Sequence, residues 1–286
     1  MLVISVVAHV DHGKTTLLDN ILSFTRTISP ISAGTLRYLD SRIDEQERGI
    51  TLKLSFFQAE NYIFIDTPGH IDFESLIECS SFLCDSFIFI VDVNEGITPR
   101  TLSLLNWMKN KNCILVLNKI DKMVNKEVYM VTSQIIESMN VFLEEEYFVW
   151  EKNNIIISSS LSLYGLNFDK FKILKENNTL KDALAFIFLL SDDTEEIKRE
   201  KLLKLLKSKN IHTTEIKKIF PLSHTLLNSL KAIELGFVRN IDNERKKIVK
   251  LFQEDFISQK RDYEPQLEDL TSQLEDLESQ KKEHEP

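Results

Sequence analysis

Close to its start the chain reads Ala8-His-Val-Asp-His-Gly-Lys-Thr-Thr16, directly after the apolar run Leu2–Val7. An apolar strand followed by a loop ending in Gly-Lys-Thr and then a helix is typical of a phosphate-binding loop, although Ala8 stands where the first glycine is usual. The loop N–H groups and helix N-terminus face phosphate oxygens, Lys14 adds a positive charge, and Thr15 offers a hydroxyl to Mg²⁺. Taken alone, the pattern fits a chance turn about equally well. The candidate nucleotide-binding residues here are His9, Val10, Asp11, His12, Gly13, Lys14, Thr15 and Thr16.

Short apolar runs alternate with helical patterns over the first part of the chain, which predicts an α/β fold with a mostly parallel sheet. One connection, Gln58–Asn61, is too short for a parallel crossover, so the runs on either side of it are expected to form an antiparallel hairpin. The expected strands are Leu2–Val7, Leu52–Phe57, Tyr62–Ile65, Ser86–Val91, Cys113–Leu117 and Asn154–Ile157.

The second strand of the hairpin ends in Asp66-Thr-Pro-Gly-His70. Since a tight hairpin returns to the edge from which it started, Thr51 and Asp66 are expected to lie side by side, where both can reach one metal ion. Gly69 would present its N–H to a γ-phosphate, and His70 would follow it into the space of an attacking water. Read alone, Asp-Thr-Pro-Gly is a simple turn.

The sequence Asn118-Lys-Ile-Asp121 follows another expected strand. A carboxylate at Asp121 can accept hydrogen bonds from N1–H and the 2-amino group of guanine, which adenine does not offer, and such a buried acceptor discriminates by roughly 10⁴–10⁵-fold. Asn118, Lys119 and Asp121 are therefore candidate guanine-site residues. A backbone N–H of the run Ser159-Ser160-Leu161 is placed to meet guanine O6, although a serine run at a strand end is more often a plain loop.

Composition excludes several classes of protein. With 286 residues and 43% hydrophobic content the chain is expected to fold, and its net charge of -9 argues against general binding to DNA or RNA. The three cysteines lack Cys-x-x-Cys spacing, which predicts neither disulfides nor zinc and fits a reducing, cytoplasmic location. The longest apolar runs are far shorter than the ~20 residues of a membrane span, so no membrane is expected as a partner.

Beyond the strand-rich part, helical patterns dominate from about Asn167 to Leu235. Residues after Gly236 are acidic, with leucines at 3-4-3 spacing over Leu267–Leu277, a stripe shorter than three heptads. We therefore predict two domains: a nucleotide-binding domain over residues 1–236, and a helical, charged tail of possible coiled-coil type over residues 237–286.

The phosphate loop, Thr51, the Asp-x-x-Gly turn and Asn-Lys-x-Asp occur in order, each at a strand end. Together they resemble the G domain of translational GTPases, a P-loop NTPase fold, and Ala8–Thr16 with Asp66–His70 is similar to elongation factor 2. Ser32–Arg42 and Asp44–Thr51 are closer to the elongation factor-like GTPase of large-subunit maturation, and Pro221–His224 also resembles that relative. The resemblance covers roughly residues 2–235.

The resemblance implies a GTPase that acts on cytoplasmic precursors of the large ribosomal subunit. There, with the Shwachman–Bodian–Diamond protein and other ribosome-maturation proteins as partners, it would release the anti-association factor. By the same match Thr51 is a Mg²⁺ ligand, Asp66 holds Mg²⁺ through water, and His70 is the catalytic residue that orients the attacking water. Val10 and Ile50 would form an apolar gate that keeps His70 aside until the ribosome draws it in.

Two other functions stay open on the sequence. One is a non-catalytic GTP-binding module whose nucleotide state controls docking of a partner. The other is a fragment of a translation elongation factor that acts in translocation. Relatives continue into further domains, whereas no strand-rich segment follows Gly236. We therefore expect either a fragment or a form in which a helical tail replaces those domains.

Overall fold

The computed structural model describes residues 1–25, 51–109, 111–123, 127–175, 178–191, 196–209, 211 and 213–235. The chain divides into two compact units, Met1–Val238 and Arg239–Pro286, and every described residue belongs to the first. The expected tail lies outside the described residues, as do Ile50 of the expected gate and the segments Ser32–Arg42 and Asp44–Ile50. The domain boundary at residue 236 therefore stays a prediction.

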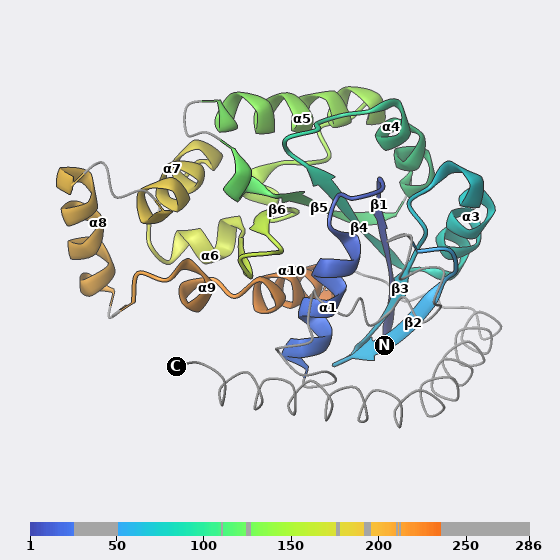
Figure 1. The fold of residues 1–286 in the computed structure, drawn as a ribbon, viewed down its shortest axis with the longest axis horizontal. Helices are drawn as coiled ribbons and strands as arrows, with labels where there is room; N and C mark the ends of the chain where they lie inside the picture. Colours follow the sequence, from blue (N-terminus) through green and yellow to red (C-terminus); the bar gives the residue numbers. More distant parts are fainter. Residues whose placement is uncertain are drawn as a thin grey trace, which may run out of the picture. The chain divides into compact units, whose positions relative to one another are not determined.

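A seven-stranded sheet forms the centre of the described structure, with strand order β2-β3-β1-β4-β5-β6-β7 (Figure 1). The interior pairs are parallel, and β1 and β4 are buried along their whole length and mostly apolar, because helices cover both faces. The α/β prediction is thus confirmed. The strands are β1 (Leu2–Ala8), β2 (Ser55–Ala59), β3 (Tyr62–Asp66), β4 (Ser86–Asp92), β5 (Asn112–Asn118), β6 (Ile155–Ser159) and β7 (Tyr164–Leu166).

The expected hairpin is present at one edge of the sheet, where β2 and β3 are antiparallel. Its turn is tighter than expected, since Ala59 pairs with Tyr62 and leaves two residues between the strands. The first strand also begins later than expected. Ser55 already faces Asp66, the last residue of β3, and the chain beyond contains Pro68, which has no N–H to extend the ladder.

The opposite edge carries a second antiparallel pair, β6 with β7, which the sequence patterns did not indicate. Gly165, in the middle of β7, has no room for a side chain, because an added Cβ would lie 2.7 Å from a Leu222 methyl carbon. Its N–H donates to the Phe220 carbonyl at 3.0 Å, and its carbonyl accepts from the Thr225 hydroxyl at 2.7 Å. The short strand is therefore held by the start of the last described helix.

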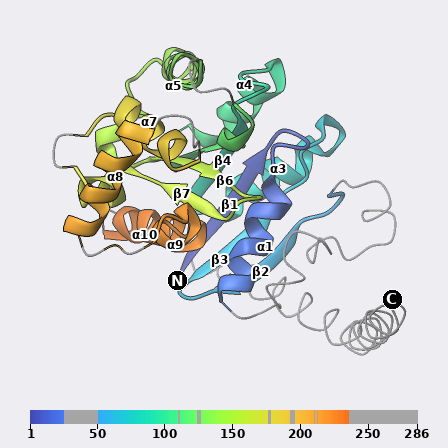
Figure 2. The ribbon, with the colours of Figure 1, turned by 60° about the vertical axis from the view of Figure 1, so that its left-hand side comes forward.

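Helices lie on both faces of the sheet (Figures 1 and 2). On one face α1 and α10 pack against each other and against the strands. From the other side α3 and α4 pack against β1, and α5 packs against α4. The helices of four or more residues are α1 (Lys14–Phe24), α3 (Glu74–Leu83), α4 (Pro99–Leu105), α5 (Val128–Leu143), α6 (Phe168–Lys172), α7 (Leu180–Ser191), α8 (Glu196–Ser208), α9 (Ile216–Ile219) and α10 (Leu222–Leu235).

Short 3-10 helices complete the described elements: η1 (Ile71–Phe73), η2 (Asn106–Met108), η3 (Ile120–Lys122) and η4 (Trp150–Lys152).

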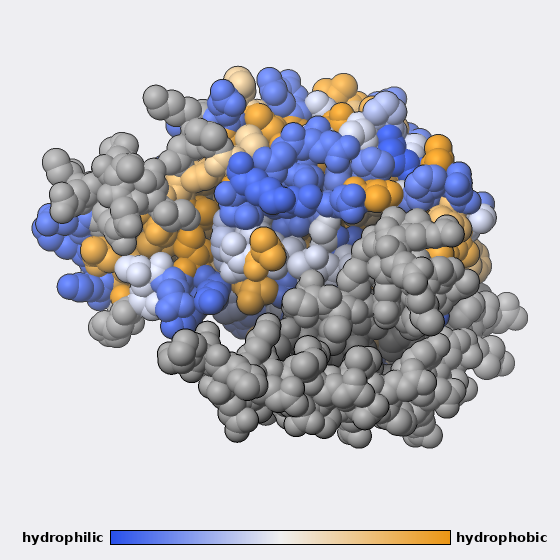
Figure 3. Space-filling model, in the orientation of Figure 1, coloured by the Kyte–Doolittle hydropathy of each residue, from blue (hydrophilic) through white to orange (hydrophobic). Residues whose placement is uncertain are grey.

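Hydrophilic residues cover most of the middle of the face seen in Figure 3. A search of the described helices finds none with the length and apolar character that would let it cross a bilayer.

All three cysteines of the chain are free thiols. Cys79 is exposed on α3, Cys84 is buried at the end of that helix, and Cys113 is buried on β5. Burial raises the pKa of the Cys113 thiol far above its usual range.

Candidate functional site

The loop between β1 and α1 has the backbone shape that a phosphate-binding loop requires. Gly13 precedes α1 with φ +95°, and its carbonyl accepts the first helical hydrogen bond, from Leu17 at 3.0 Å. A Cβ at Gly13 would lie 2.3 Å from Asn118 Nδ2. Glycine is therefore needed here both for the left-handed conformation and for space. Along the loop Asp11 is exposed, while Val10 and Thr16 are half-buried.

Lys14, Thr51 and Asp66, which we call the Lys14 cluster, meet at the end of β3. The Lys14 ammonium donates to Thr51 Oγ1 at 3.2 Å and forms an ion pair with the Asp66 carboxylate. All three residues are buried, and so is Thr15, which follows Lys14 in the sequence. Thr51 and Asp66 thus lie within reach of one cation, which is the arrangement that the hairpin argument predicts.

The turn after β3 packs tightly on the phosphate loop. The Thr67 hydroxyl donates to the Val6 carbonyl at 2.7 Å and joins the turn to β1. A Cβ at Gly69 would lie 3.0 Å from the backbone nitrogen of Val10 and 3.1 Å from the carbonyl oxygen of Ala8. Because backbone atoms cannot move aside cheaply, this position has no room for a side chain. Thr67 was not among the predicted site residues, and a threonine in a turn carries no signal of such a bond.

His70 lies at the surface beside this turn, with a side chain 48% exposed. Its Nδ1 accepts a hydrogen bond from the Asp72 backbone at 3.3 Å and lies 3.4 Å from the Asp72 carboxylate. The imidazole therefore contacts its own turn, and the described residues show no hydrogen bond between it and the Lys14 cluster. Its predicted role requires a different orientation of the side chain.

Glu74, Arg100 and Trp107 form a network that the sequence analysis missed. Arg100 forms an ion pair with Glu74 and directs its Nε towards the Gly69 carbonyl at 3.5 Å, while Trp107 Nε1 donates to Glu74 at 2.6 Å. Burial opposes ionisation of Glu74, but the bonds from Trp107 and Arg100 outweigh it and lower the pKa of that carboxyl. The partners are 26 and 33 residues away from Glu74, so no local pattern reveals them.

The two histidines of the phosphate loop lie against β4. The His12 side chain is buried, its Nδ1 accepts from the Asp92 backbone N–H at 3.2 Å, and its Nε2 lies 2.8 Å from Glu95. The His9 ring packs edge-on against that of His12. Burial and the neighbouring His12 lower the pKa of His9, which favours its neutral form at pH 7. The buried imidazole of His12 thus connects the phosphate loop to the end of β4 and to Glu95, and its role towards nucleotide stays a prediction.

Asn118, Ser158 and Ser160 form a second group, the Asn118 cluster, where β5 and β6 end. Asn118 Nδ2 donates to the His12 carbonyl at 2.9 Å. Asn118 Oδ1 accepts from the Ser160 backbone N–H at 2.9 Å and from the Ser160 and Ser158 hydroxyls at 3.0 and 3.3 Å. The side chain of Asn118 thus joins the phosphate loop to the expected guanine loop. The motif predicts that Asn118 belongs to the site but gives no hint of these partners.

The remaining predicted residues lie around this cluster. Lys119 adopts φ +62° and forms an ion pair with Asp92 at 2.7 Å. Asp121 lies in η3 with an exposed side chain, and no hydrogen bond or ion pair to it is found in the described part of the chain. Ser159 is buried, whereas Leu161 is 76% exposed.

A further contact connects the guanine loop to α10. Asn20 on α1 donates from Nδ2 to the Ser160 carbonyl at 2.8 Å, and the Asn20 carbonyl accepts from the Ser223 hydroxyl at 3.0 Å. Ser223 belongs to the stretch Pro221–His224, which the sequence analysis noted as part of the resemblance. Its position shows how that stretch is connected, through α1, to the loop that is expected to contact guanine.

Comparison with known proteins gives one family and several relatives. The family model described as "Elongation factor Tu GTP binding domain" matches residues 1–233. "Elongation factor-like GTPase 1" of Mus musculus is 32% identical over 266 residues, which cover 72% of this chain and 24% of that protein. "Ribosome assembly protein 1" of Schizosaccharomyces pombe is 30% identical over 294 residues, 86% of this chain and 29% of that protein.

The namesake "Ribosome assembly protein 1" of Saccharomyces cerevisiae is 40% identical over 163 residues, 48% of this chain and 15% of that protein. The chain therefore spans less than a third of the length of each of these relatives.

Proposed function

The chain belongs to the elongation factor Tu GTP-binding domain family, and from that membership we propose that it binds GTP with Mg²⁺ and hydrolyses it to GDP and phosphate. The observation that carries the proposal is the Lys14 cluster. An ammonium, a hydroxyl and a carboxylate converge there at the start of α1, beside a turn that is packed against the phosphate loop. This is the combination of charge and oxygen ligands that a nucleoside triphosphate with its metal requires.

The donor set fits Mg²⁺. This ion prefers oxygen ligands and is commonly held by one or two protein groups together with phosphate oxygens and water. Thr15, Thr51 and Asp66 offer two hydroxyls and one carboxylate, and the contacts of Lys14 with Thr51 and Asp66 put those two oxygens around one cation. Among the described residues no group of three or more His, Cys, Asp and Glu side chains that could hold a metal is found. When bound, Mg²⁺ supplies positive charge to the phosphates.

The residues of the candidate site then have the following roles. Lys14 would turn from Asp66 towards the β- and γ-phosphate oxygens, which join the N–H groups at the start of α1. Gly69 would offer its N–H to the γ-phosphate from a backbone that is held against the loop. His70 would rotate away from Asp72 and position the attacking water. Because that rotation breaks existing contacts, we expect slow hydrolysis by the isolated protein.

Guanine would be selected by the exposed carboxylate of Asp121, which is available to the N1–H and 2-amino groups of the base. The neighbouring Asn118 cluster would hold the base loop at a fixed distance from the phosphate loop. Ser159, Ser160 and Leu161 would form the other side of the base site, with a backbone N–H directed at O6.

For its biological role we propose that the chain acts in maturation of the large ribosomal subunit in the cytoplasm, where it promotes release of the anti-association factor. The names of the relatives, "Elongation factor-like GTPase 1" and "Ribosome assembly protein 1", support this assignment over translocation. The proposed partners are the large subunit or its precursor and ribosome-maturation proteins.

A non-catalytic GTP-binding module is the second candidate, favoured by the contact of His70 with Asp72. Multiple-turnover GTP hydrolysis, measured with and without large-subunit particles that carry the anti-association factor, separates the two. The enzyme is accelerated by the particle and releases the factor, by analogy with the 10³–10⁵-fold effects of partner-supplied groups. A binding module shows no acceleration.

The residue that tests the chemistry is His70. We expect His70→Ala to abolish the stimulated hydrolysis and to leave GTP affinity within about twofold, because the side chain contacts no part of the Lys14 cluster. His224→Ala is the matched control, since His224 is also an exposed histidine and lies on α10. Unchanged stimulated turnover in His70→Ala would remove this residue from the mechanism.

A further inference from the structure

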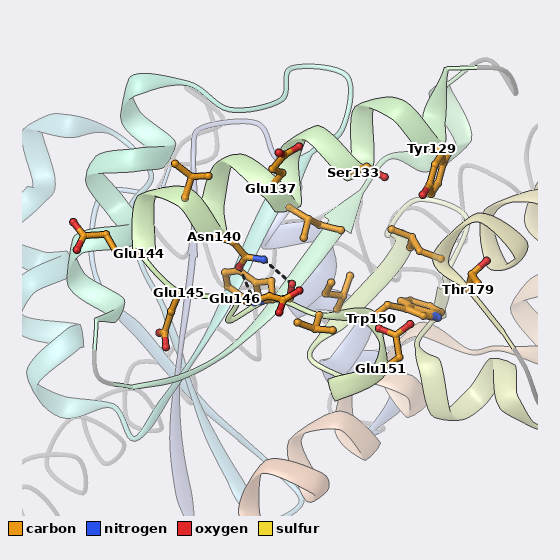
Figure 4. A pocket seen from close by; sticks show the side chains of 16 residues that line it. Tyr129, Ser133, Glu137, Asn140, Glu144, Glu145, Glu146, Trp150, Glu151 and Thr179 are labelled. Atoms are coloured by element: carbon orange, nitrogen blue, oxygen red, sulfur yellow. Dashed lines mark hydrogen bonds between the residues drawn. The ribbon is translucent and has the colours of Figure 1, made fainter.

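A cavity of about 660 Å³ lies beside α5, formed by that helix, the segment that follows it and the start of α7 (Figure 4). None of its lining residues belongs to the Lys14 cluster, the Asn118 cluster or the turn around His70. Its size falls within the range of about 300–1,000 Å³ that is usual for ligand sites. The proposed binding and hydrolysis of GTP do not involve this cavity.

The floor of the cavity is apolar. It includes Ile136 from α5, the buried Phe148 and Trp150, and Leu180 from α7. Beside them on α5, the side chain of Val141 is 71% exposed. Tyr129 on the same helix is 43% exposed, so the apolar surface open to solvent comes from these two α5 side chains, while Phe148 and Trp150 support the hollow from beneath. Exposed apolar side chains gathered beside a hollow are typical of a contact surface for a partner.

The rim of the cavity is acidic. Five glutamates line it, and Figure 4 shows them around the apolar side chains. No lysine or arginine lines the cavity, and within the described ranges none of the five carboxylates takes part in an ion pair. The five residues are Glu137, Glu144, Glu145, Glu146 and Glu151.

The walls are held in place by hydrogen bonds. Asn140 on α5 binds the backbone of Phe148 in both directions, donating to its carbonyl at 2.9 Å and accepting from its N–H at 2.8 Å (Figure 4). Trp150 donates from Nε1 to Asn178 at 2.9 Å. The two buried aromatic side chains are therefore fixed before any partner arrives, which lowers the entropy cost of binding.

Two lysines, one at each end, lie beside the cavity without lining it. Lys152 donates to the Glu146 carbonyl at 2.6 Å, and Lys181 lies 5.7 Å from the centre of the Tyr129 ring at the other end. Neither is bonded to a rim carboxylate. Three of the five rim glutamates, Glu144, Glu145 and Glu146, are consecutive and exposed, so the negative charge of the rim is densest there.

We propose that this cavity is the docking site of a basic, amphipathic peptide segment of another protein. Its apolar side chains would enter the hollow between Ile136 and Trp150, and its lysines or arginines would face the three consecutive glutamates. An apolar groove with a charged rim is the surface that receives amphipathic helices in other proteins, and here the sign of the rim selects a basic partner. The site is separate from the nucleotide and adds a partner surface to the proposed GTPase.

The experiment uses the full chain and a fluorescently labelled peptide of about 15 residues, with leucines on one helical face and lysines on the other. Its affinity is measured by anisotropy for the unmodified chain and for Glu145→Gln/Glu146→Gln. Because two charge contacts are lost, we expect binding to weaken about five- to tenfold. The matched control is Glu78→Gln/Glu200→Gln, which removes two exposed glutamates elsewhere. This control should bind within twofold of the unmodified chain.

Two companion peptides test the chemistry of the site. Replacing the leucines by serines removes the apolar contact, and replacing the lysines by glutamates reverses the charge; both should bind at least tenfold more weakly. Equal weakening by the control variant would show attraction to acidic surface in general and would overturn the proposal. So would strong binding of either companion peptide.

A second copy of the chain is the competing occupant. Sedimentation equilibrium decides this point: dimerisation that Glu145→Gln/Glu146→Gln abolishes would assign the groove to self-association and overturn the peptide proposal. GTP affinity of the same variant should equal that of the unmodified chain. It reports on the nucleotide site separately, so failure of one proposal leaves the other standing.

Discussion

The Lys14 cluster and the Asn118 cluster sit at the two ends of the candidate site and are built from opposite chemistry. In the Asn118 cluster, neutral amide and hydroxyl groups bond to one another and to backbone, and the side chain of Asn118 uses both its oxygen and its nitrogen. In the Lys14 cluster, a full positive charge lies against a full negative charge and a hydroxyl. The Asn118 cluster is thus a scaffold of neutral groups that hydrogen-bond to one another, whereas the Lys14 cluster is centred on an ion pair.

This difference in chemistry predicts which end of the candidate site changes when a ligand binds. Exchanging the partners of Asn118 would strand buried polar groups, which is costly. The ammonium of Lys14 can instead exchange Asp66 for phosphate oxygens of the same charge sign, while Asp66 gains the metal ion. We therefore expect the phosphate end to rearrange with ligand and the base end to keep its bonds. Four predictions test this comparison, from the largest effect to the smallest.

The largest effect concerns the choice of base beside the rigid Asn118 cluster. Asp121 is exposed in the free protein, not buried as the motif suggested, and the bound base would cover it. We expect GTP to bind roughly 10⁴–10⁵-fold more tightly than ATP, because adenine would leave this covered carboxylate unpaired. Asp121→Asn should shift the preference to xanthine nucleotides, whose C2 oxygen accepts from the new amide. Titration with labelled nucleotides measures both. Similar affinities of the unmodified chain for ATP and GTP would contradict the assignment.

The second effect concerns the scaffold itself. Asn118→Ala should lower the free energy of unfolding by about 3 kcal/mol, because it removes the partners of buried groups in two loops. Chemical denaturation measures this loss. The control is Asn94→Ala: Asn94 bonds to Asp92 and Lys119 but is exposed, so its loss should stay below about 1 kcal/mol. If the two variants lose equal stability, the Asn118 cluster is not a scaffold.

The third effect separates space from backbone conformation at the contact between the phosphate loop and Asn118. Gly13 and Gly96 both have positive φ, +95° and +73°, but an added Cβ meets Asn118 only at Gly13 and nothing within 4 Å at Gly96. Both alanine variants should lose about 1 kcal/mol for the left-handed conformation. Gly13→Ala should lose about 1–3 kcal/mol more through overpacking. Thermal unfolding compares the pair, and equal losses would show that Asn118 moves aside freely.

The smallest effect depends on pH and involves Glu74, which joins Arg100 to the turn at the phosphate end. Since the pKa of Glu74 in the folded protein lies below its ordinary value of 4.5, the ionised group stabilises the fold above pH 4.5. That contribution is lost as the pH falls through the lowered pKa. Glu74→Gln should therefore cost about 1 kcal/mol or less at pH 7, since the group is partly exposed, and the loss should shrink as the pH falls below 4.5. A loss that is constant with pH would assign the effect to packing.

The central part of the fold could be predicted from sequence because buried parallel strands are continuous apolar runs. The interior strands β1, β4 and β5 are of this kind, and the short connection before Tyr62 identifies the antiparallel edge. The strand β7 was missed for a physical reason. It has only three residues, contains Gly165, and is held in place by contacts with Phe220 and Thr225 that lie far along the chain.

For the candidate site, sequence indicated which residues converge but not how they are held. The hairpin geometry placed Thr51 and Asp66 together, and in the structure both contact Lys14, which the sequence had assigned to the phosphates alone. The bonds of Asn118 to Ser160 and of Glu74 to Trp107 join segments dozens of residues apart. No spacing rule encodes such pairs, because they depend on the packing of whole elements. The roles of the site residues in binding and catalysis stay predictions.

Because the thiols differ in exposure, one cysteine can be labelled selectively. A maleimide reacts with thiolate, so the buried Cys113, whose pKa is strongly raised, is protected, and Cys84 is enclosed as well. Cys79 alone stands open to solvent, on the helix that follows the His70 turn. A single dye can therefore be attached to α3 without any engineered cysteine. The same exposure makes Cys79 the thiol that oxygen can reach, and its oxidation would link two molecules through a disulfide, so the unlabelled protein should be kept with a reductant.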